Sequence, residues 1–230
     1  MLHKEVSQQV PVITIDGPSG SGKGTLAGLL SNELGWNLLD SGALYRILSW
    51  VTVDRQIAID AVDQMVQLAQ SLDVKFEQTA TGLQILVDGR DISRDIRTEG
   101  CGNTASKIAA LIPVREALLA FQRDCRQFPG LVADGRDMGT VIFPDAVLKF
   151  FLTASAEERT KRRYKQLREK GFDVNITALL QEVVERDERD RNRAVSPLKP
   201  ADDAIIIDCT ELSISEVQQK MQTLVSANIY

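Results

Sequence analysis

The sequence has almost no histidine and little cysteine. His3 is the single histidine among 230 residues, and it lies in an N-terminal tail that we expect to be frayed. Unless His3 folds inward, the chain lacks the imidazole that a Ser-His-Asp triad, a Cys-His pair or a histidine metal site requires. The cysteines, Cys101, Cys125 and Cys209, are odd in number and far apart, which predicts free thiols rather than disulfides or a zinc site. The chemistry therefore has to use lysine, arginine, carboxylates and backbone amides.

Long apolar segments and aromatic side chains are also scarce. No apolar run approaches the length that crosses a bilayer, and Met1–Gln9 contains no hydrophobic stretch of the kind found in secretory signals. Together with the free thiols, this predicts a cytoplasmic protein without a membrane partner. The net charge of −5 and the aromatic content of 5% disfavour a nucleic-acid partner. We further expect a monomer.

A glycine-rich loop between a predicted strand and a predicted helix is the strongest motif. It follows the apolar run Val10–Ile15 and precedes the helix-like segment Leu26–Leu34. Backbone N–H groups in such a loop curl around an anion, and the helix N-terminus and a lysine add positive charge. The strict pattern G-x-x-x-x-G-K-[ST] fails by one residue because Gly24 separates Lys23 from Thr25; the alternative is an ordinary glycine-rich turn. The residues expected to bind phosphate are Gly17, Pro18, Ser19, Gly20, Ser21, Gly22, Lys23, Gly24 and Thr25.

The alternation of segments predicts a single α/β domain with small insertions. Short apolar runs bounded by Gly, Pro or Asp are typical of strands buried on both faces of a parallel sheet. They are Val10–Asp16, Trp36–Asp40, Leu131–Asp134, Val147–Leu152 and Ala204–Asp208. Helices fall between them, two with capping boxes at Ser155/Glu158 and Ser213/Glu216. We therefore expect a P-loop NTPase core with a parallel five-stranded sheet flanked by helices.

One region interrupts this alternation. Residues 72–93 contain two strand-like runs around a turn at Thr79–Gly82, which predicts an inserted β-hairpin. The expected division is a core of residues 10–67 and 107–230, an inserted antiparallel subdomain of residues 68–106 and a short lid of about residues 159–175.

Several predicted strands end in turns that carry an aspartate. Ligands of doubly wound sheets bind beyond the carboxyl ends of the strands, so the turns after Asp16, Asp40 and Asp134 should converge on one cleft. Asp134, at a buried strand tip beside the phosphate loop, suits Mg²⁺ held through water. Direct contact of Thr25 with Mg²⁺ stays open. The alternative for Asp134 is a strand-end residue that caps a turn.

The segment Glu185–Arg193 alternates arginines with acids. The apolar periodicity of residues 176–184 predicts one helix that continues through it. At roughly 100° per residue, Arg186, Asp190 and Arg193 lie within about 60° of one another at the edge of the apolar face. An unpaired charge there is costly, and a bound polyphosphate would satisfy the arginines. The alternative is a structural Arg–Asp network.

Other arginines lie where they can complete an anion site. Arg159 and Arg163 precede a basic stretch that we expect to be a loop up to Gly171, and together they resemble a closing lid; a solvated helix explains them equally well. Arg46 and Arg136 follow strand-end turns and indicate a second phosphate site, unless these are ordinary helix starts or turns. Transfer between two phosphates requires mainly positioning and charge neutralisation, because the acceptor is already ionised.

Four segments, in this order, are similar to successive motifs of the bacterial cytidylate kinase family. They are Gly17–Thr25, Leu39–Arg46, Ala133–Thr140 and Glu185–Arg193. Kinases of this group share the G-K-G-T form of the loop, and the hairpin fits their enlarged monophosphate-binding subdomain. The resemblance spans Val12 to about Thr210. It implies a nucleoside monophosphate kinase of pyrimidine metabolism that transfers the γ-phosphoryl group of ATP to CMP or dCMP, with Mg²⁺, giving ADP and CDP or dCDP.

The resemblance also implies roles for individual side chains. Its catalytic residues are Lys23, Arg163, Arg186, Arg193 and Asp134. Its CMP-binding residues are Ser41, Arg46, Ser106, Arg115, Arg136, Asp137, Arg186 and Asp190. Among these, Ser106, Arg115 and Asp137 would read the cytosine edge, and Asp190 would contact the ribose. Cytosine donates from its 4-amino group where uracil has an accepting carbonyl, so a carboxylate such as Asp137 favours cytosine.

Three other functions remain open at this point. The first is a P-loop kinase acting on another monophosphate or a small metabolite. The second is a nucleotide-binding switch, although the sequence has neither N-K-x-D nor L-S-G-G-Q and the second arginine cluster serves no purpose in a switch. The third is a nucleic-acid-binding ATPase, which the acidic balance disfavours. Rates with CMP, dCMP, UMP and AMP would separate these possibilities.

Overall fold

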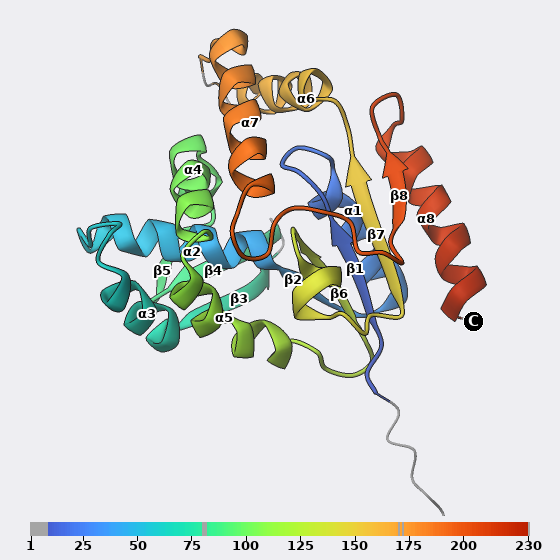
Figure 1. Cartoon of the computed structure of the whole chain (residues 1–230), viewed down its shortest axis with the longest axis horizontal. Coiled ribbons are helices and arrows are strands. Elements are labelled where there is room, and N and C mark those ends of the chain that lie inside the picture. Colours follow the sequence, from blue (N-terminus) through green and yellow to red (C-terminus); the bar gives the residue numbers. More distant parts are fainter. Residues whose placement is uncertain (1–8, 80–81, 170, 172, 230) are drawn as a thin grey trace, which may run out of the picture.

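A parallel five-stranded sheet forms the centre of the protein (Figure 1). This computed structural model describes residues 9–79, 82–169, 171 and 173–229, so His3 lies outside the described residues. The strand order is β2-β6-β1-β7-β8. The strands are β1 (Val12–Asp16), β2 (Asn37–Asp40), β6 (Leu131–Gly135), β7 (Leu148–Thr153) and β8 (Ile205–Asp208). All five predicted strands and the predicted α/β core are confirmed.

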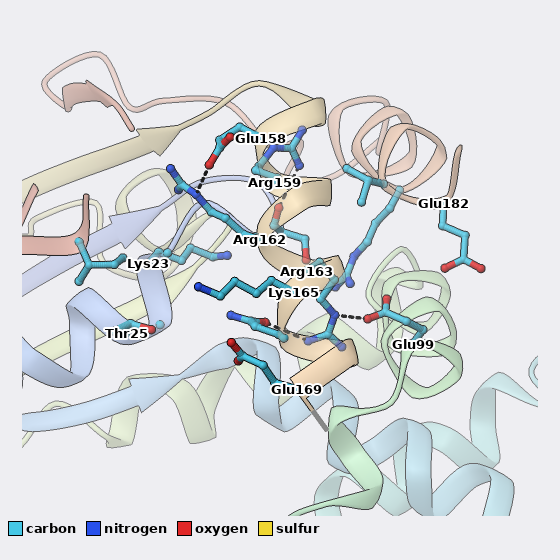
Figure 2. Close-up of a pocket in the computed structure, with 18 of the residues that line it drawn as sticks. Lys23, Thr25, Glu99, Glu158, Arg159, Arg162, Arg163, Lys165, Glu169 and Glu182 are labelled. Atoms are coloured by element: carbon cyan, nitrogen blue, oxygen red, sulfur yellow. Dashed lines mark hydrogen bonds and ion pairs between the residues drawn. The ribbon is translucent and has the colours of Figure 1, made fainter. Parts of the chain in front are cut away.

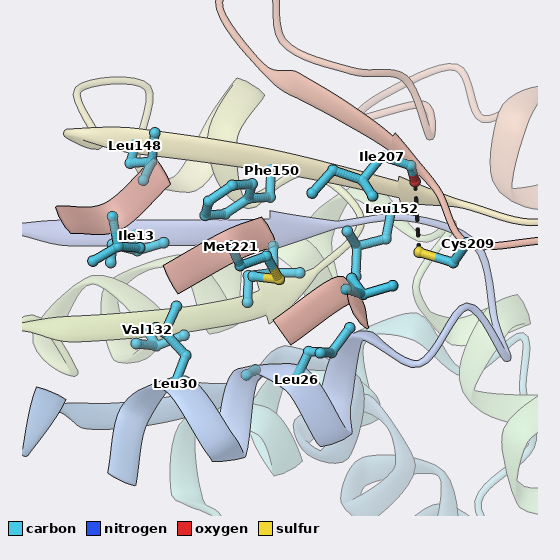
Figure 3. Packing of buried hydrophobic residues seen from close by; sticks show 14 of the residues in the cluster. Ile13, Leu26, Leu30, Val132, Leu148, Phe150, Leu152, Ile207, Cys209 and Met221 are labelled. Carbon is cyan, nitrogen blue, oxygen red and sulfur yellow. Dashed lines mark hydrogen bonds between the residues drawn. The ribbon is translucent and has the colours of Figure 1, made fainter. Parts of the chain in front are cut away.

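Helices cover both faces of this sheet, which is why β1 and β6 are buried along their whole length. Successive side chains of a strand point to opposite faces, so Ile13 and Val12 of β1 enter different apolar clusters. The cluster of Ile13 packs the sheet against α1 (Lys23–Leu34) and α8 (Ile214–Ile229), as Figure 3 shows. The other cluster includes side chains from the short helical segment η2 (Met138–Ile142). This packing fixes the strand ends that carry the candidate site.

A second, antiparallel sheet of three strands forms beside the core, in the order β3-β4-β5. β3 (Val74–Thr79) and β4 (Gly82–Val87) pair as the predicted hairpin, whose turn residues 80 and 81 lie outside the described part of the chain. The short strand β5 (Arg90–Asp91) pairs with β4 and was not predicted. Because β5 has only two residues, its sequence carries no alternation by which a strand can be recognised.

The second sheet packs with several helices around a common apolar cluster. These elements are α2 (Ser41–Asp54), α3 (Val62–Ser71), η1 (Asp95–Arg97), α4 (Glu99–Ile108) and α5 (Ile112–Asp124). The cluster runs from Tyr45 in α2 to Leu118 in α5. It therefore includes side chains on both sides of the expected insertion, residues 68–106, whose bounds stay a prediction.

Two helices, α6 (Ala156–Glu169) and α7 (Ile176–Arg191), lie above the carboxyl ends of the strands (Figure 1). At the predicted capping box of Ser155 only one of the two reciprocal hydrogen bonds forms. Ser155 Oγ accepts from the Glu158 N–H at 3.1 Å, whereas the Ser155 N–H donates to Thr210 Oγ1. In the box that precedes α8, the Ser213 N–H donates to Glu216 Oε2 at 2.8 Å and the Glu216 N–H donates to Ser213 Oγ at 3.3 Å.

Two expectations for this region are wrong. The basic stretch before Gly171 was expected to be a loop but is helical through Glu169, as part of α6. The helix over the Arg–Asp segment was expected to include Arg193, but α7 ends at Arg191. There the chain folds back, and the Leu198 N–H donates to the carbonyl of Asp190 at 2.8 Å. No helix of the part of the chain that the structure describes is long and apolar enough to span a membrane.

Candidate active site

The strand-end turns meet at one edge of the sheet, as predicted. Asp16 of β1 lies opposite Gly135 of β6, and Asp40 of β2 lies opposite Asp134 of β6. Parallel strands in this register bring their carboxyl ends to the same edge. The glycine-rich loop, the start of α2 and the segment after β6 therefore surround a common space beneath α6 and α7.

The glycine-rich loop follows β1 directly and leads into α1. A side chain on Gly17 would place its Cβ 2.1 Å from the carbonyl oxygen of Leu152, so only glycine fits between β1 and β7. Gly22 caps α1 with φ 93° and provides no side-chain hydrogen bond to the first N–H groups of that helix. These N–H groups are left to an anion, and the helix dipole favours one.

Lys23 lies at the inner end of the loop with only 8% of its surface exposed. Its Nζ donates to the carbonyl of Pro18 at 3.1 Å. Burial and, to a smaller extent, the nearby Arg136 lower the pKa of Lys23 to about 8, against the opposing effect of Asp134. A polyphosphate beside Nζ would favour the charged form and raise this pKa again.

Asp134 faces the loop from the end of β6 and is 5% exposed. Burial raises its pKa to about 7, against the opposing effect of Lys23. Its Oδ1 is buried without a hydrogen-bond partner, and a Cβ on Gly24 would lie 3.1 Å from its Oδ2. The extra glycine of G-K-G-T thus lets the loop approach this carboxylate closely. A buried carboxylate oxygen without a partner, at the strand end beside the loop, fits a hydrated cation.

A cavity of about 570 Å³ opens between the loop and the helices above it (Figure 2). Loop residues from Ser19 to Thr25 form one wall, and α6 and α7 form the other. Cationic side chains predominate, and those from the two helices are Arg159, Arg162, Arg163, Lys165 and Arg186. The cavity therefore attracts a polyanion of nucleoside-triphosphate size.

The two arginines expected in a lid have different surroundings. Arg159 is 2% exposed and forms a buried ion pair with Asp187 of α7, and it also donates to the carbonyl of Ser19 at 2.9 Å. It therefore ties α6 to α7 and to the loop. Arg163 pairs with Glu99 of α4 and donates to the carbonyl of Arg97 at 3.0 Å. Its guanidinium faces the cavity (Figure 2) and bridges to the other side of the cleft.

A smaller cavity, of about 50 Å³, lies on the far side of Arg186. It contains all the predicted CMP-binding residues except Arg46: Ser41, Ser106, Arg115, Arg136, Asp137, Arg186 and Asp190. Arg193 lines it as well, and Arg186 is the side chain common to both cavities. Side chains from α2, α4, α5 and α7 and from the segment after β6 thus come together here.

Asp190 is the centre of the charge network in the smaller cavity. It accepts from Arg136 Nε at 3.0 Å and from Ser106 Oγ at 3.0 Å, and it pairs with Arg193. Burial alone would raise its pKa, but Arg136, Arg193 and Arg186 outweigh burial and hold the pKa far below its ordinary value. This carboxylate stays ionised at any physiological pH.

Arg115 and Asp137 form a second buried pair, 8% and 3% exposed respectively. Arg115 also donates to the carbonyl of Ala109 at 3.1 Å, and its guanidinium lies 5.8 Å from the ring centre of Tyr45. The Tyr45 hydroxyl is buried without a partner. Such a cluster presents a donor and an acceptor side by side, which suits recognition of a flat heterocycle.

No ion pair with an acidic side chain is formed by Arg186 or Arg46 within the described part of the chain. Burial and the nearby Arg136 lower the pKa of Arg186 to about 9, and its Nε has no hydrogen-bond partner. Arg46 is held by the carbonyls of Ile96 and Thr98, at 2.8 and 3.2 Å, and it lines the larger cavity. Both guanidiniums would be stabilised by an anion between the cavities.

Comparison with known proteins identifies the family of the chain. The family model described as cytidylate kinase matches residues 13–227 of the chain. The chain belongs to the cytidylate kinase family. The resemblance inferred from the four motifs is thereby confirmed.

Relatives in this family are similar over nearly the whole chain. A protein of Aeromonas hydrophila named cytidylate kinase is 60% identical over 210 residues, which are 91% of each chain. One of Pseudomonas entomophila with the same name is 58% identical and covers 95% of this chain and 96% of its own. One of Shewanella denitrificans is 53% identical, covering 97% and 100%. The similarity thus extends over at least nine tenths of the length of each of these relatives.

Several residues that build the site were not predicted. Asp187 pairs with Arg159, Glu99 pairs with Arg163, and the buried Gln122 accepts from Ser41 Oγ at 2.6 Å. Asp187 belongs to the recognised Arg–Asp segment, and its helical position indicated that it is not on the Arg186 face. Glu99 and Gln122 carry no motif, and only the fold brings them to the cleft.

Proposed function

We propose that the larger cavity binds ATP and the smaller one binds CMP or dCMP, and that the protein performs the reaction of its family, ATP-dependent phosphorylation of CMP or dCMP. The observation that carries this proposal is the pair of cavities joined at Arg186. One has a phosphate-binding loop as its wall, and the other contains the buried Arg115–Asp137 pair. The products are ADP and CDP or dCDP.

Transfer occurs where the two cavities meet. The loop N–H groups and Lys23 hold the donor phosphates, while Arg46 and Arg136 hold the acceptor phosphate. The acceptor oxygen is already ionised near neutral pH, so no general base is needed. Lys23, Arg163, Arg186 and Arg193 then neutralise the charge on the transferred phosphoryl group. Arg163 has to leave Glu99 before it can do so.

Asp134 and Thr25 are the residues that would hold a Mg²⁺ ion brought by ATP. The ion would supply charge neutralisation at the donor phosphates. Asp134 has the buried, unpartnered oxygen that a water of such an ion needs as acceptor. Among the described residues, no group of three or more His, Cys, Asp or Glu side chains is placed to hold a metal by itself. This supports entry of the ion with the nucleotide.

The base is read by Ser106, Arg115 and Asp137. The Asp137 carboxylate accepts from the cytosine 4-amino group, and Arg115 donates to the accepting edge of the ring. Uracil has a carbonyl in place of the amino group. Two hydrogen-bond acceptors, this carbonyl and the Asp137 carboxylate, would then face each other with no proton between them. Asp190 accepts from the sugar hydroxyl, as its ionised state allows. Ser41 contacts the acceptor phosphate at the start of α2.

Steady-state kinetics test this proposal. With ATP and Mg²⁺, kcat/KM should be highest for CMP and dCMP and lower by at least about 100-fold for UMP and AMP. The reason is that a base with the wrong donors and acceptors leaves buried polar side chains without hydrogen-bond partners. A faster rate with AMP than with CMP would indicate another monophosphate kinase. ATP hydrolysis that is independent of any acceptor would favour a nucleotide-binding switch.

Some expectations from the sequence remain part of this proposal. The free thiols of Cys101, Cys125 and Cys209 support a cytoplasmic location. The monomeric state and the domain bounds are proposed on the sequence pattern alone, and gel filtration with limited proteolysis would test both.

A further inference from the structure

Asp16 is a buried carboxylate that lines neither cavity. It is the last residue of β1, immediately before Gly17 of the glycine-rich loop, and only 4% of its surface is exposed. Burial raises its pKa to about 7, although two backbone hydrogen bonds work in the opposite direction. Burying a carboxylate costs folding free energy unless its oxygens accept hydrogen bonds.

Both oxygens of Asp16 are used by the segment that follows Asp137. Oδ1 accepts from the N–H of Met138 at 2.9 Å, and Oδ2 accepts from the N–H of Gly139 at 2.8 Å. These are the first N–H groups of η2, which have no partner within that segment. Asp16 therefore caps η2 from the neighbouring strand, directly after the residue proposed to read the base.

The same turn is also closely packed against Thr14 and Lys149. A Cβ on Gly139 would lie 2.8 Å from Thr14 Oγ1 and 3.1 Å from Lys149 Cδ. Thr14 Oγ1 itself has no hydrogen-bond partner, so its contact with the turn is steric. Because Met138 and Gly139 are hydrogen-bonded to Asp16 and Gly139 is closely packed, this backbone has little freedom, and the adjoining backbone of Asp137 shares the constraint.

We propose that Asp16 is the positioning residue that holds Asp137 where it discriminates cytosine from uracil, and that it ties this reading position to the start of the ATP loop. The inference rests on the proposed function, since it assumes that Asp137 reads the base. It adds a residue outside the pocket, on the strand that also leads into Gly17. Selection of the base then depends on hydrogen bonds to Asp16, a residue that does not contact the nucleotide.

Asp16→Asn tests this with almost no change of shape. An amide keeps one acceptor, but its NH₂ group faces the N–H of Met138 or Gly139 and repels it. We expect the KM for CMP to rise about 10- to 100-fold, the range for loss of a charge-assisted hydrogen bond. The CMP-over-UMP preference should fall by a similar factor. The KM for ATP at saturating CMP should change by less than about two-fold, because the loop N–H groups are not involved.

Gly139→Ala displaces the same turn without altering Asp16. Its methyl group meets Thr14 Oγ1, so the variant should show the same split between the two substrates. Thr14→Val is the matched control: it replaces a buried hydroxyl that makes no hydrogen bond, and all kinetic constants should stay within about two-fold of the parent. Thermal melts of all three variants, with a second control of Asp137→Asn, accompany the kinetics.

The outcomes separate this inference from the proposed function. A parent enzyme without preference for CMP over UMP contradicts the proposed function itself. If Asp137→Asn removes the preference but Asp16→Asn and Gly139→Ala keep it, or if these two raise both KM values equally, the positioning role is wrong. Amide hydrogen exchange in the unaltered enzyme without nucleotide covers the case of unfolded variants. The Met138 and Gly139 amides should be strongly protected there, and rapid exchange would overturn the inference.

Discussion

The two sides of the cleft are built in different ways: the ATP side is the larger cavity, which we propose to bind ATP, and the CMP side is the smaller cavity, which we propose to bind CMP. The ATP side is a roomy cavity of about 570 Å³ with a wall of backbone N–H groups and one buried lysine. The CMP side has about 50 Å³ of free space, and its charges are paired with one another, Arg115 with Asp137 and Arg136 with Asp190. The groups that bind the ligand are therefore mainly backbone N–H groups on the ATP side and mainly side chains on the CMP side.

This difference explains where selectivity arises. Backbone N–H groups bind any phosphate and need no rearrangement, so the ATP side is preorganised. The paired side chains of the CMP side have to exchange partners when a nucleotide enters, and only a base with matching donors and acceptors compensates for the lost pairs. Substituting one residue of a pair on the CMP side should therefore lower the free energy of unfolding. Substituting a residue on the ATP side should mainly lower the rate of catalysis.

The largest effect is expected at Asp190, on the CMP side. Asp190→Ala leaves Arg136 and Arg193 buried without their carboxylate, which should lower the free energy of unfolding by about 3–5 kcal/mol and abolish detectable CMP phosphorylation. Urea unfolding without nucleotide measures the first effect and a coupled assay measures the second. A stable Asp190→Ala protein would mean that the network does not support the fold. Because the pKa of Asp190 lies below its ordinary value, its contribution to stability is present above about pH 4 and is lost only as the pH falls through the lowered pKa.

Arg186→Ala should show the opposite pattern. Arg186 Nε has no partner and burial lowers its pKa, so its removal should change stability little, while kcat falls about 10²- to 10³-fold, as for loss of one transition-state donor.

The matched control for Arg186→Ala is Arg191→Ala, an exposed residue on the same helix α7. Its kinetic constants should remain within about two-fold of the parent. If Arg191→Ala proved more damaging than Arg186→Ala, the assignment of the cleft-facing side of α7 would be wrong.

Asp134→Asn should separate catalysis from stability on the ATP side. The folded-state pKa of Asp134 is raised to about 7 from an ordinary 3.8, so the fold favours its protonated form. The stability this provides is complete below the unfolded pKa and is lost as the pH rises through about 7. At about pH 8 without nucleotide, Asp134→Asn should therefore be more stable than the parent by about 1–3 kcal/mol. Near pH 4 the gain should vanish. Activity should fall at both pH values, and a variant less stable at pH 8 would contradict the burial argument.

The smallest effect is expected at Glu99, which lines the larger cavity and pairs with Arg163. The Arg163–Glu99 pair is partly exposed, with 20% and 30% of the side chains accessible, and such pairs contribute only about 0–1 kcal/mol. Glu99→Gln should leave stability almost unchanged and lower the KM for ATP by up to about five-fold, because Arg163 no longer has to be released. Glu158→Gln, which removes the partner of Arg162, is the control. A higher KM for ATP in Glu99→Gln would show that the pair assists binding.

The sequence predicted the ATP side better than the CMP side, for a physical reason. A phosphate loop is local: strand, glycines, lysine and helix lie within one stretch, and the five strands have clear apolar patterns. The network of Asp190 joins α4, α7 and the segment after β6, which no local pattern reveals. Ser106 and Arg115 were found only through resemblance to a family, and that family is confirmed. The end of α7 and the helical form of the stretch between Arg163 and Glu169 were missed because tertiary contacts decide them. The N–H of Leu198, for example, donates to the carbonyl of Asp190 where the chain folds back after α7.

The most direct test of the two-cavity account is a crystal structure with CMP bound. The account predicts the cytosine ring in the smaller cavity, its 4-amino group within hydrogen-bond distance of Asp137, and its phosphate between Arg46 and Arg136. CMP bound in the larger cavity, or a base that touches neither Asp137 nor Arg115, would contradict it.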